Sequence, residues 1–422
     1  MKYWFKISLL LSVFGFLKDF RPSEHFIYEF LVGPWRNITD KEVTQKVYPV
    51  ATYSYLAQLI IVFLITDLLR YKPLIIVLGL SGIVIWSMLL WTTSLLNLQI
   101  LEGFYGTYMA TEVAYYTYMY AKVPQEHYQQ VTGHARAAIL TGRFLSGTIG
   151  QLLISFSVMN YRDLNYLTFA AQILATFWAF LLPPVKKSIY FNREITDTTP
   201  LNDRGKLRQA FSLLWQHFVT SYSNIHVVKW SLWWAMATCG FIQVQSYMQP
   251  LWAEIQPRLD SEKVYNGAVE AILTLLGTLA ALLAGSLRTN WKLKGELTLA
   301  VCSIIEGAAL LIASQTSQVV VSYACYIVFG SLYHFMITVV SSEVAKDIPE
   351  DTYGLVFGLN TLIALSLQTI VMLVVVDGDV GMGLSPRNQY LMYGGYFMAI
   401  AAVYIVIGVI SWSKVKKTEC IT

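Results

Sequence analysis

The sequence predicts an all-α membrane protein with twelve transmembrane helices in two bundles of six. Of its 422 residues, 55% are hydrophobic and only 13% are charged, whereas a soluble chain carries about 25% charged residues. Apolar stretches of about 20 residues, long enough to cross the hydrocarbon core as helices, recur along the whole chain. One long polar segment divides these stretches into two groups of equal number.

The apolar stretches give six predicted spans on each side of the polar segment. Residues 186–228 form this segment and contain the basic clusters KK, NRE and RGKLR, so we expect a cytoplasmic linker. It would join an N-terminal bundle (1–185) to a C-terminal bundle with a short tail (229–422). The predicted spans are 4–20, 48–69, 73–95, 98–121, 135–158, 164–183, 229–248, 266–287, 296–314, 318–341, 354–376 and 390–412.

The basic residues predict how the chain is oriented in the membrane. With the N-terminus inside, twenty of the thirty lysines and arginines lie in inner segments and eight in outer segments, while Lys18 and Arg143 lie within spans. Cytoplasmic segments are enriched in Lys and Arg, so both termini are expected to be cytoplasmic. The sequon Asn37-Ile38-Thr39 falls in the first outer loop, which makes Asn37 a candidate glycosylation site.

The composition gives no sign of a cofactor, a metal or a nucleic-acid partner. The four cysteines have neither metal-site nor disulfide-framework spacing. The net charge of +4 is explained by the membrane orientation and needs no nucleic acid. The expected partners are the lipid bilayer and a small molecule.

The segment LEGFYGTYMATEVAYYTYMY, residues 101–120, carries the main group of candidate binding residues. Glu102, Tyr105, Met109, Glu112 and Tyr116 are spaced three or four apart and share one helix face. An acidic residue at the centre of a membrane helix costs about 3 kcal/mol to insert, so it normally faces a cavity or a partner. The two alternatives are a polar wall that binds a substrate and a structural ion pair with a neighbouring helix. The tyrosines would stack on a flat heterocycle or serve as packing residues.

Arg143 lies about two turns inside the fifth span and is a candidate for the same site. Gly142 and Gly147 flank it and would let a neighbouring helix approach closely. Three roles remain open: neutralising Glu112, binding an anion, or extending to the cytoplasmic surface.

Four further polar residues are weaker candidates. Glu24, where the first span ends, lies at the cavity mouth or at the membrane interface. Asn266 precedes Glu270 by four residues on one helix face. His334 is either a proton carrier or a packing residue, and Gln368 would offer a neutral amide to the cavity.

The stretch TDLLRYKP, residues 66–73, joins the second and third spans on the predicted inner side. Asp67, near a helix end and beside Arg70 and Lys72, resembles the gating loop of major-facilitator proteins, and the resemblance implies a charge latch between the two bundles that breaks when a transporter reverses. Asp67 and Arg70 are the candidate gating residues.

Two other function classes lack their sequence signatures. An intramembrane enzyme needs a set of reacting groups, but only His334 is deep in a span, and the chain has no GxSxG, HExxH or phosphate-binding glycine loop. A receptor usually has seven spans. The sequence therefore favours neither class.

Many blocks in order resemble the reduced folate and thiamine carriers, from about residue 20 to residue 390. The resemblance implies a major-facilitator fold that moves a B vitamin by alternating access at the plasma membrane. Folate carriers of this family exchange substrate for organic anions and thiamine carriers are coupled to protons, so the coupling ion stays open. The blocks are FRPSE (20–24), TYSYLA (52–57), TDLLRYKP (66–73), EVAYYTYMY (112–120), EHYQQVTGHARA (126–137), LLPPVKKSIYF (181–191), KWSLWWA (229–235), YNGAVEA (265–271) and YGLVFGLNTLIALSLQTI (353–370).

Charge at the matching positions favours thiamine over folate by a small margin. Folate carriers place basic residues at the positions of Glu112, Gly330 and Gln368, and Glu112 would repel a folate dianion. Two departures oppose this: thiamine carriers have a large aromatic residue at the position of Ala51 and a tyrosine at that of Arg143. The sequence therefore predicts uptake of a B vitamin of the thiamine or folate type, with reduced folate transport by anion exchange as the alternative.

Overall fold

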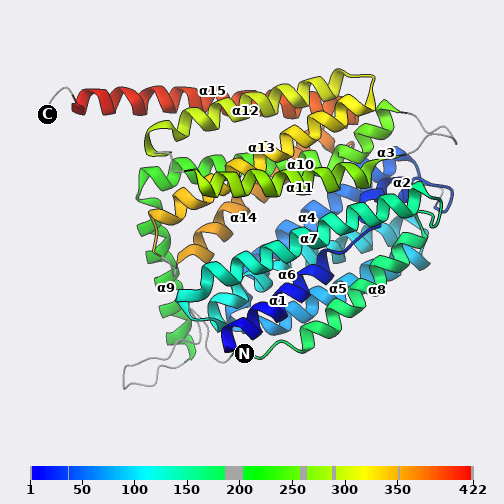
Figure 1. Cartoon of the computed structure of the whole chain (residues 1–422), viewed down its shortest axis with the longest axis horizontal. Coiled ribbons are helices and arrows are strands. Elements are labelled where there is room, and N and C mark those ends of the chain that lie inside the picture. The colour runs from blue at the N-terminus through cyan, green and yellow to red at the C-terminus, as the bar shows by residue number, and fades with distance from the viewer. Residues whose placement is uncertain are drawn as a thin grey trace. The chain divides into compact units, whose positions relative to one another are not determined.

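A computed structural model describes residues 2–36, 38–185, 203–256, 264–287, 291–349 and 352–419. All the regular secondary structure in these ranges is helical (Figure 1). This confirms the predicted all-α class.

Within the described ranges, each predicted span lies on one long helix. The predicted linker also contains a helix, α9 (Asp203–Tyr222), while its residues 186–202 lie outside the description. The helices at the predicted spans are α1 (Tyr3–Asp19), α4 (Tyr48–Leu68), α5 (Lys72–Trp91), α6 (Leu95–Lys122), α7 (Tyr128–Ser155), α8 (Asp163–Phe180), α10 (Ile225–Ile255), α11 (Asn266–Ser286), α12 (Trp291–Gln315), α13 (Val319–Lys346), α14 (Tyr353–Val371) with the π-helical η5 (Met372–Val376), and α15 (Pro386–Glu419).

Seven helices in the described ranges are long and apolar enough to cross a membrane: α5, α7, α11, α12, α13, α14 with η5, and α15. The full number of twelve spans therefore stays a prediction. The helices outside this group include α1, which ends in Lys18 and Asp19, and α6, which carries Glu102 and Glu112. Both contribute charged residues to the site described below.

The chain forms two compact units, and the first contains most of the N-terminal half. Unit 1 comprises Met1–Ser223, Lys263–Ala271 and Pro349–Leu362. In it α1 packs against α6, α7 and α8, while α5 lies between α6 and α8 and α4 lies along α6 (Figure 1). Short helices occupy the stretch between α1 and α4: η1 (Glu24–Phe26), α2 (Ile27–Leu31), α3 (Asp40–Glu42) and η2 (Val43–Val47).

Unit 2 comprises Asn224–Glu262, Ile272–Ile348 and Ile363–Thr422. Its most extensive helix packing is between α12 and α15, and α13 packs against α10 and α12 (Figure 1). Its core is rich in buried aromatic side chains such as Trp230, Trp233 and Phe329. The sequence-based boundaries at residues 185 and 229 stay a prediction, because two short stretches of the second half group with unit 1.

Candidate functional site

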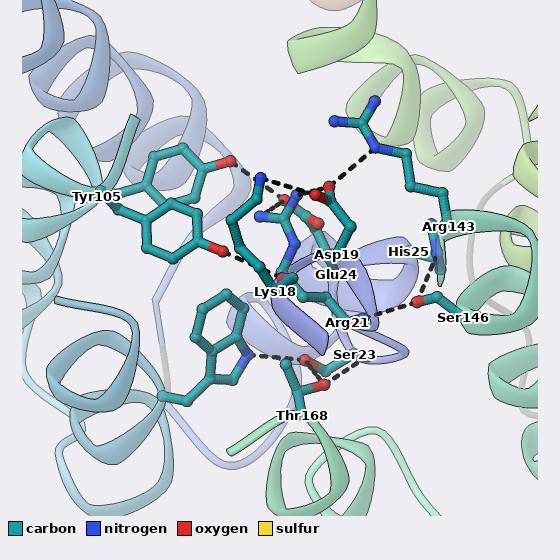
Figure 2. Close-up of polar contacts among 12 residues, drawn as sticks. Lys18, Asp19, Arg21, Ser23, Glu24, His25, Tyr105, Arg143, Ser146 and Thr168 are labelled. Atoms are coloured by element: carbon teal, nitrogen blue, oxygen red, sulfur yellow. Dashed lines mark hydrogen bonds and ion pairs between the residues drawn. The ribbon is translucent and has the colours of Figure 1, made fainter. Parts of the chain in front are cut away.

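Three cationic side chains converge on one carboxylate in unit 1 (Figure 2). Asp19, the last residue of α1, forms ion pairs with Lys18 at 2.7 Å and with Arg143 Nε at 3.0 Å. Arg21 lies 3.4 Å from the same carboxylate. Asp19 has no exposed side-chain surface, so these cations replace the water that a carboxylate would otherwise bind.

Two further carboxylates complete the network. Lys18 also pairs with Glu112 on α6, and Arg21 pairs with Glu24 at 3.0 Å. The network thus holds three cations and three anions, and its formal charge is zero.

Two tyrosines of α6 donate to the outer carboxylates. The Tyr105 hydroxyl donates to Glu24 at 3.1 Å, and the Tyr116 hydroxyl donates to Glu112 at 3.2 Å. The helical stripe predicted from the sequence therefore faces this network at Tyr105, Glu112 and Tyr116.

The end of α1 explains why Lys18 and Asp19 lie so deep. Pro22 follows three residues after Asp19, and proline cannot continue a helix. The Lys18 carbonyl at this end accepts hydrogen bonds from the Tyr108 hydroxyl and the Gln172 amide, both at 3.1 Å. These bonds satisfy a carbonyl that the terminated helix leaves without an intrahelical partner.

The turn after α1 is fixed by hydrogen bonds to three neighbouring helices (Figure 2). The Arg21 backbone N–H donates to Ser146 Oγ at 3.0 Å, and His25 Nε2 lies 3.2 Å from the same hydroxyl. On the other side, Ser23 Oγ accepts from Trp86 Nε1 at 3.0 Å and lies 3.0 Å from Thr168 Oγ1.

Close packing of α7 against α1 places Arg143 beside Asp19. A Cβ added to Gly142 would lie 2.7 Å from the Phe16 carbonyl oxygen, so only glycine allows this approach without a shift. The expectation that Gly142 permits close helix contact is thus confirmed.

The network has a buried centre and a partly exposed rim. The side chains of Lys18 and Asp19 are 1% and 0% exposed, whereas those of Glu112, Glu24 and Arg143 are 15%, 32% and 41% exposed. Removing one member of a buried ion pair typically costs about 3–5 kcal/mol, because the other charge is left uncompensated. The centre is therefore positioned to hold the rim groups in place.

The structure corrects the pairing expected for Arg143. Glu112 pairs with Lys18, so the idea that Arg143 neutralises Glu112 is wrong. Arg143 instead bonds to Asp19, while its roles in binding an anion or in reaching the cytoplasmic surface stay predictions. Two alternatives were open for Glu112: a structural ion pair with a neighbouring helix, or a role in binding a substrate. The structure shows the ion pair, with Lys18, and a role of Glu112 in binding a substrate stays a prediction.

Glu102 differs from Glu112 in having no ion pair within the described residues. It is half-buried, and its backbone carbonyl accepts a hydrogen bond from Ser54 of α4 at 3.0 Å. Of the two glutamates on this face of α6, Glu102 is therefore the one whose carboxylate has no ion pair within the described residues.

Asn266 also belongs to unit 1. It begins α11 and is buried, and its Oδ1 has no hydrogen-bond partner among the described residues. Gln151 of α7 holds the start of α11 through bonds to Val264 and Ala268 at 2.9 and 3.1 Å.

Two other candidates lie in unit 2. Gln368 is buried on α14, and its Oε1 lacks a hydrogen bond within the described part of the chain. His334 packs edge-on against the rings of Phe241 and Tyr333, and a role as a proton carrier stays a prediction.

The gating and glycosylation candidates are described only in part. Arg70 is exposed, and its φ of 59° and that of Tyr71, 65°, place both residues in the left-handed region. This turn therefore holds two strained non-glycine residues in succession. The side chain of Asp67 and the whole of Asn37 lie outside the described residues.

Sequence reasoning missed three central residues of the network. Lys18, Asp19 and Arg21 are all buried, and none of them is among the candidates predicted from the sequence. Lys18 carried a usable signal, because an ionisable residue inside a span normally has a partner.

A family model described as "Reduced folate carrier" matches residues 2–392. The mouse protein "Thiamine transporter 1" is 38% identical, and the match covers 97% of this chain and 91% of the relative. "Folate transporter 1" of Caenorhabditis elegans is 36% identical, with coverage of 97% and 93%.

Solved structures show that the fold is that of major-facilitator-like transporters. The POT family transporter PepTSo superposes with a TM-score of 0.68 at 12% identity over 98% of this chain and 99% of its own. The nucleoside transporter NupG gives a TM-score of 0.61 at 14% identity, over 95% of this chain and 98% of its own.

These matches confirm the sequence prediction of a multi-pass membrane carrier rather than an enzyme. The network of unit 1 is built from residues inside the matched range. The chain belongs to the reduced folate carrier family.

Proposed function

We propose that this protein takes up a B vitamin of the thiamine or folate type by secondary active transport. In this proposal the chain lies in the plasma membrane with both termini in the cytoplasm, and it works by alternating access. The excess of inner lysines and arginines supports this orientation.

The observation that carries the proposal is the partly exposed rim of the buried network. Glu24, Glu112 and Arg143 present charged groups, and Tyr105 and Tyr116 bring aromatic rings to the same place. Ion pairs buried solely for packing are seldom more stable than apolar side chains of similar size, so their presence calls for another role. Charged groups beside aromatic rings suit a flat, polar vitamin.

Thiamine is the first candidate substrate, and the carboxylate that favours it is Glu102 rather than Glu112. Because Lys18 neutralises Glu112, the acidic group that would attract the thiazolium cation or accept from an amino group is Glu102. Half-buried carboxylates without an ion pair attract cations strongly, since little solvent screens them.

Reduced folate, carried by anion exchange, is the second candidate, and Arg143 favours it. The pairing of Glu112 with Lys18 also weakens the repulsion that a folate dianion would meet. Glu24, Asn266 and Gln368 are secondary binding candidates, and Asp67 with Arg70 would act as a gate.

The decisive experiment is uptake of labelled thiamine and a labelled reduced folate in cells that lack other carriers for both. The purified protein in sealed vesicles provides the second arm. Imposed proton and organic-anion gradients would identify the coupling ion. Accumulation of neither vitamin in either system would contradict the proposal.

Two variants test which glutamate of α6 contacts thiamine. We expect Glu102→Gln to raise the thiamine concentration needed for half-maximal uptake by roughly tenfold, as loss of one charge-assisted contact implies. Glu112→Gln would weaken uptake indirectly, because it frees Lys18. The matched control is Glu126→Gln, since Glu126 lies exposed in the short helix η3 (Gln125–His127).

A further inference from the structure

The guanidinium of Arg143 uses only one of its three nitrogens within the network. Its Nε donates to Asp19 Oδ1 at 3.0 Å. Among the described residues, its two terminal amino groups have no hydrogen-bond partner. Figure 2 shows this pair of groups pointing away from Asp19, with no dashed line to either nitrogen. Two parallel donors therefore remain available.

Arg143 is also the most accessible cation of the network. Its side chain is 41% exposed, compared with 1% for Lys18 and 9% for Arg21. Lys18 is already shared between two carboxylates, and Arg21 bonds to Glu24. An incoming ligand would thus meet the donors of Arg143 first.

The direction of these donors is fixed before any ligand binds. Asp19 is fully buried and held by two other cations, and Gly142 keeps α7 against α1 at the preceding residue. A long side chain normally loses rotamer freedom when it binds a ligand, and an orientation fixed in advance reduces that loss.

The chemistry of the available pair selects the ligand. Two parallel N–H groups of a guanidinium match the oxygens of a carboxylate or a phosphate, and such bidentate pairs are stronger than neutral hydrogen bonds. The nearest carboxylate of α6, Glu112, is neutralised by Lys18, and Tyr116 donates to it. Each carboxylate of the network already has a cationic partner, so these carboxylates do not compete with a ligand for the two free donors of Arg143.

We propose that Arg143 is a specificity-determining residue that binds an oxyanion of the transported vitamin. The vitamin would then carry a carboxylate, as a folate does, or a phosphate, as a phosphate ester of thiamine does. This inference rests on the proposed function, since it names the substrate class of the same site.

The test measures uptake of a reduced folate, thiamine monophosphate and thiamine by the full chain and by Arg143→Gln. We expect the variant to raise the concentration for half-maximal uptake of the preferred anionic vitamin by at least about tenfold, while thiamine changes less than about twofold. Uptake of the reduced folate tests whether Arg143 binds a carboxylate, and uptake of thiamine monophosphate tests whether it binds a phosphate. Arg143→Lys keeps the charge but loses the paired donors, so we expect an intermediate loss.

The matched control is Arg136→Gln, two helical turns earlier on α7 and exposed. Surface expression of each variant separates misfolding from loss of binding, and Arg143→Lys replaces Arg143→Gln if the latter fails to reach the surface. Equal half-maximal concentrations for the anionic vitamins in variant and parent would overturn the inference. So would thiamine uptake by the parent without uptake of either anionic form, although the proposed function would stand. Uptake of none of the three compounds would refute the proposed function and the inference with it.

Discussion

Glu306 in unit 2 is buried in a different way from the carboxylates of the unit 1 network. In unit 1, Asp19 and Glu112 are surrounded by Lys18, Arg21 and Arg143, so each of these two carboxylates has a cationic partner. In unit 2, Glu306 on α12 is completely buried, and neither of its oxygens has a hydrogen-bond partner among the described residues.

The difference shows that burial alone does not identify a binding site. Unit 1 commits four charged positions of α1 and its following turn, Lys18, Asp19, Arg21 and Glu24, to one network. That network leaves exposed groups at its rim, whereas Glu306 has no exposed surface. We therefore expect a ligand to contact the unit 1 network through these groups, whereas Glu306 should affect mainly stability.

The largest effect is expected at the centre of the unit 1 network. Asp19→Asn would leave Lys18, Arg21 and Arg143 without their shared counter-charge. The loss of a buried partner predicts a stability decrease of about 3–5 kcal/mol and the loss of vitamin uptake. Thermal unfolding of the purified protein and uptake in cells would measure both. Asp379→Asn, at an exposed position in the loop before α15, is the control and should change neither.

A rescue experiment separates structural from functional pairing at Glu112. Lys18→Met alone should destabilise the chain by roughly 3 kcal/mol, because Glu112 loses its cationic partner while Asp19 keeps Arg21 and Arg143. The double variant with Glu112→Met should recover most of this stability, since apolar side chains often replace a buried ion pair without loss. Stability that recovers while uptake stays low would assign the pair a role in transport. Recovery of both would make it purely structural.

Replacing glutamate by methionine should raise the stability of the protein at Glu306 in unit 2 and lower it at Glu112 in unit 1. Glu306→Met removes a buried carboxyl group that has no hydrogen bond within the described residues, so we expect a gain of about 1–3 kcal/mol. Glu112→Met alone should lose stability, because Lys18 is then left with a weaker set of partners. Thermal unfolding of the two single variants is the measurement, and destabilisation by both would remove the contrast between the units.

A smaller effect is expected where helices touch at glycine. Gly142→Ala places a Cβ 2.7 Å from the Phe16 carbonyl oxygen, and Gly307→Ala places one 3.0 Å from the Gly394 carbonyl oxygen in unit 2. Each should cost about 1–2 kcal/mol through overpacking, but only Gly142→Ala should weaken uptake, since it moves Arg143. Gly133→Ala, on the same helix as Gly142, has no atom within 4 Å of the added Cβ and serves as the control. Equal uptake by the Gly142 and Gly307 variants would show that the position of Arg143 is unimportant.

The sequence by itself determined the helical membrane class, the place of the long helices and the face of α6 that carries Tyr105, Glu112 and Tyr116. These features follow from local rules, because hydropathy over about 20 residues and the 3.6-residue helical period are properties of continuous segments. The blocks that resemble known carriers pointed to the family that the comparisons confirmed.

Only the tertiary structure decided which charges pair. Arg143 and Glu112 both looked like partners from their depth, yet Lys18 takes Glu112 and Asp19 takes Arg143. Partner choice depends on which helices are neighbours and on where α1 stops, and neither is encoded within a single segment. A separation of 94 residues between Lys18 and Glu112 is bridged by packing, so it has no signature in hydropathy or period.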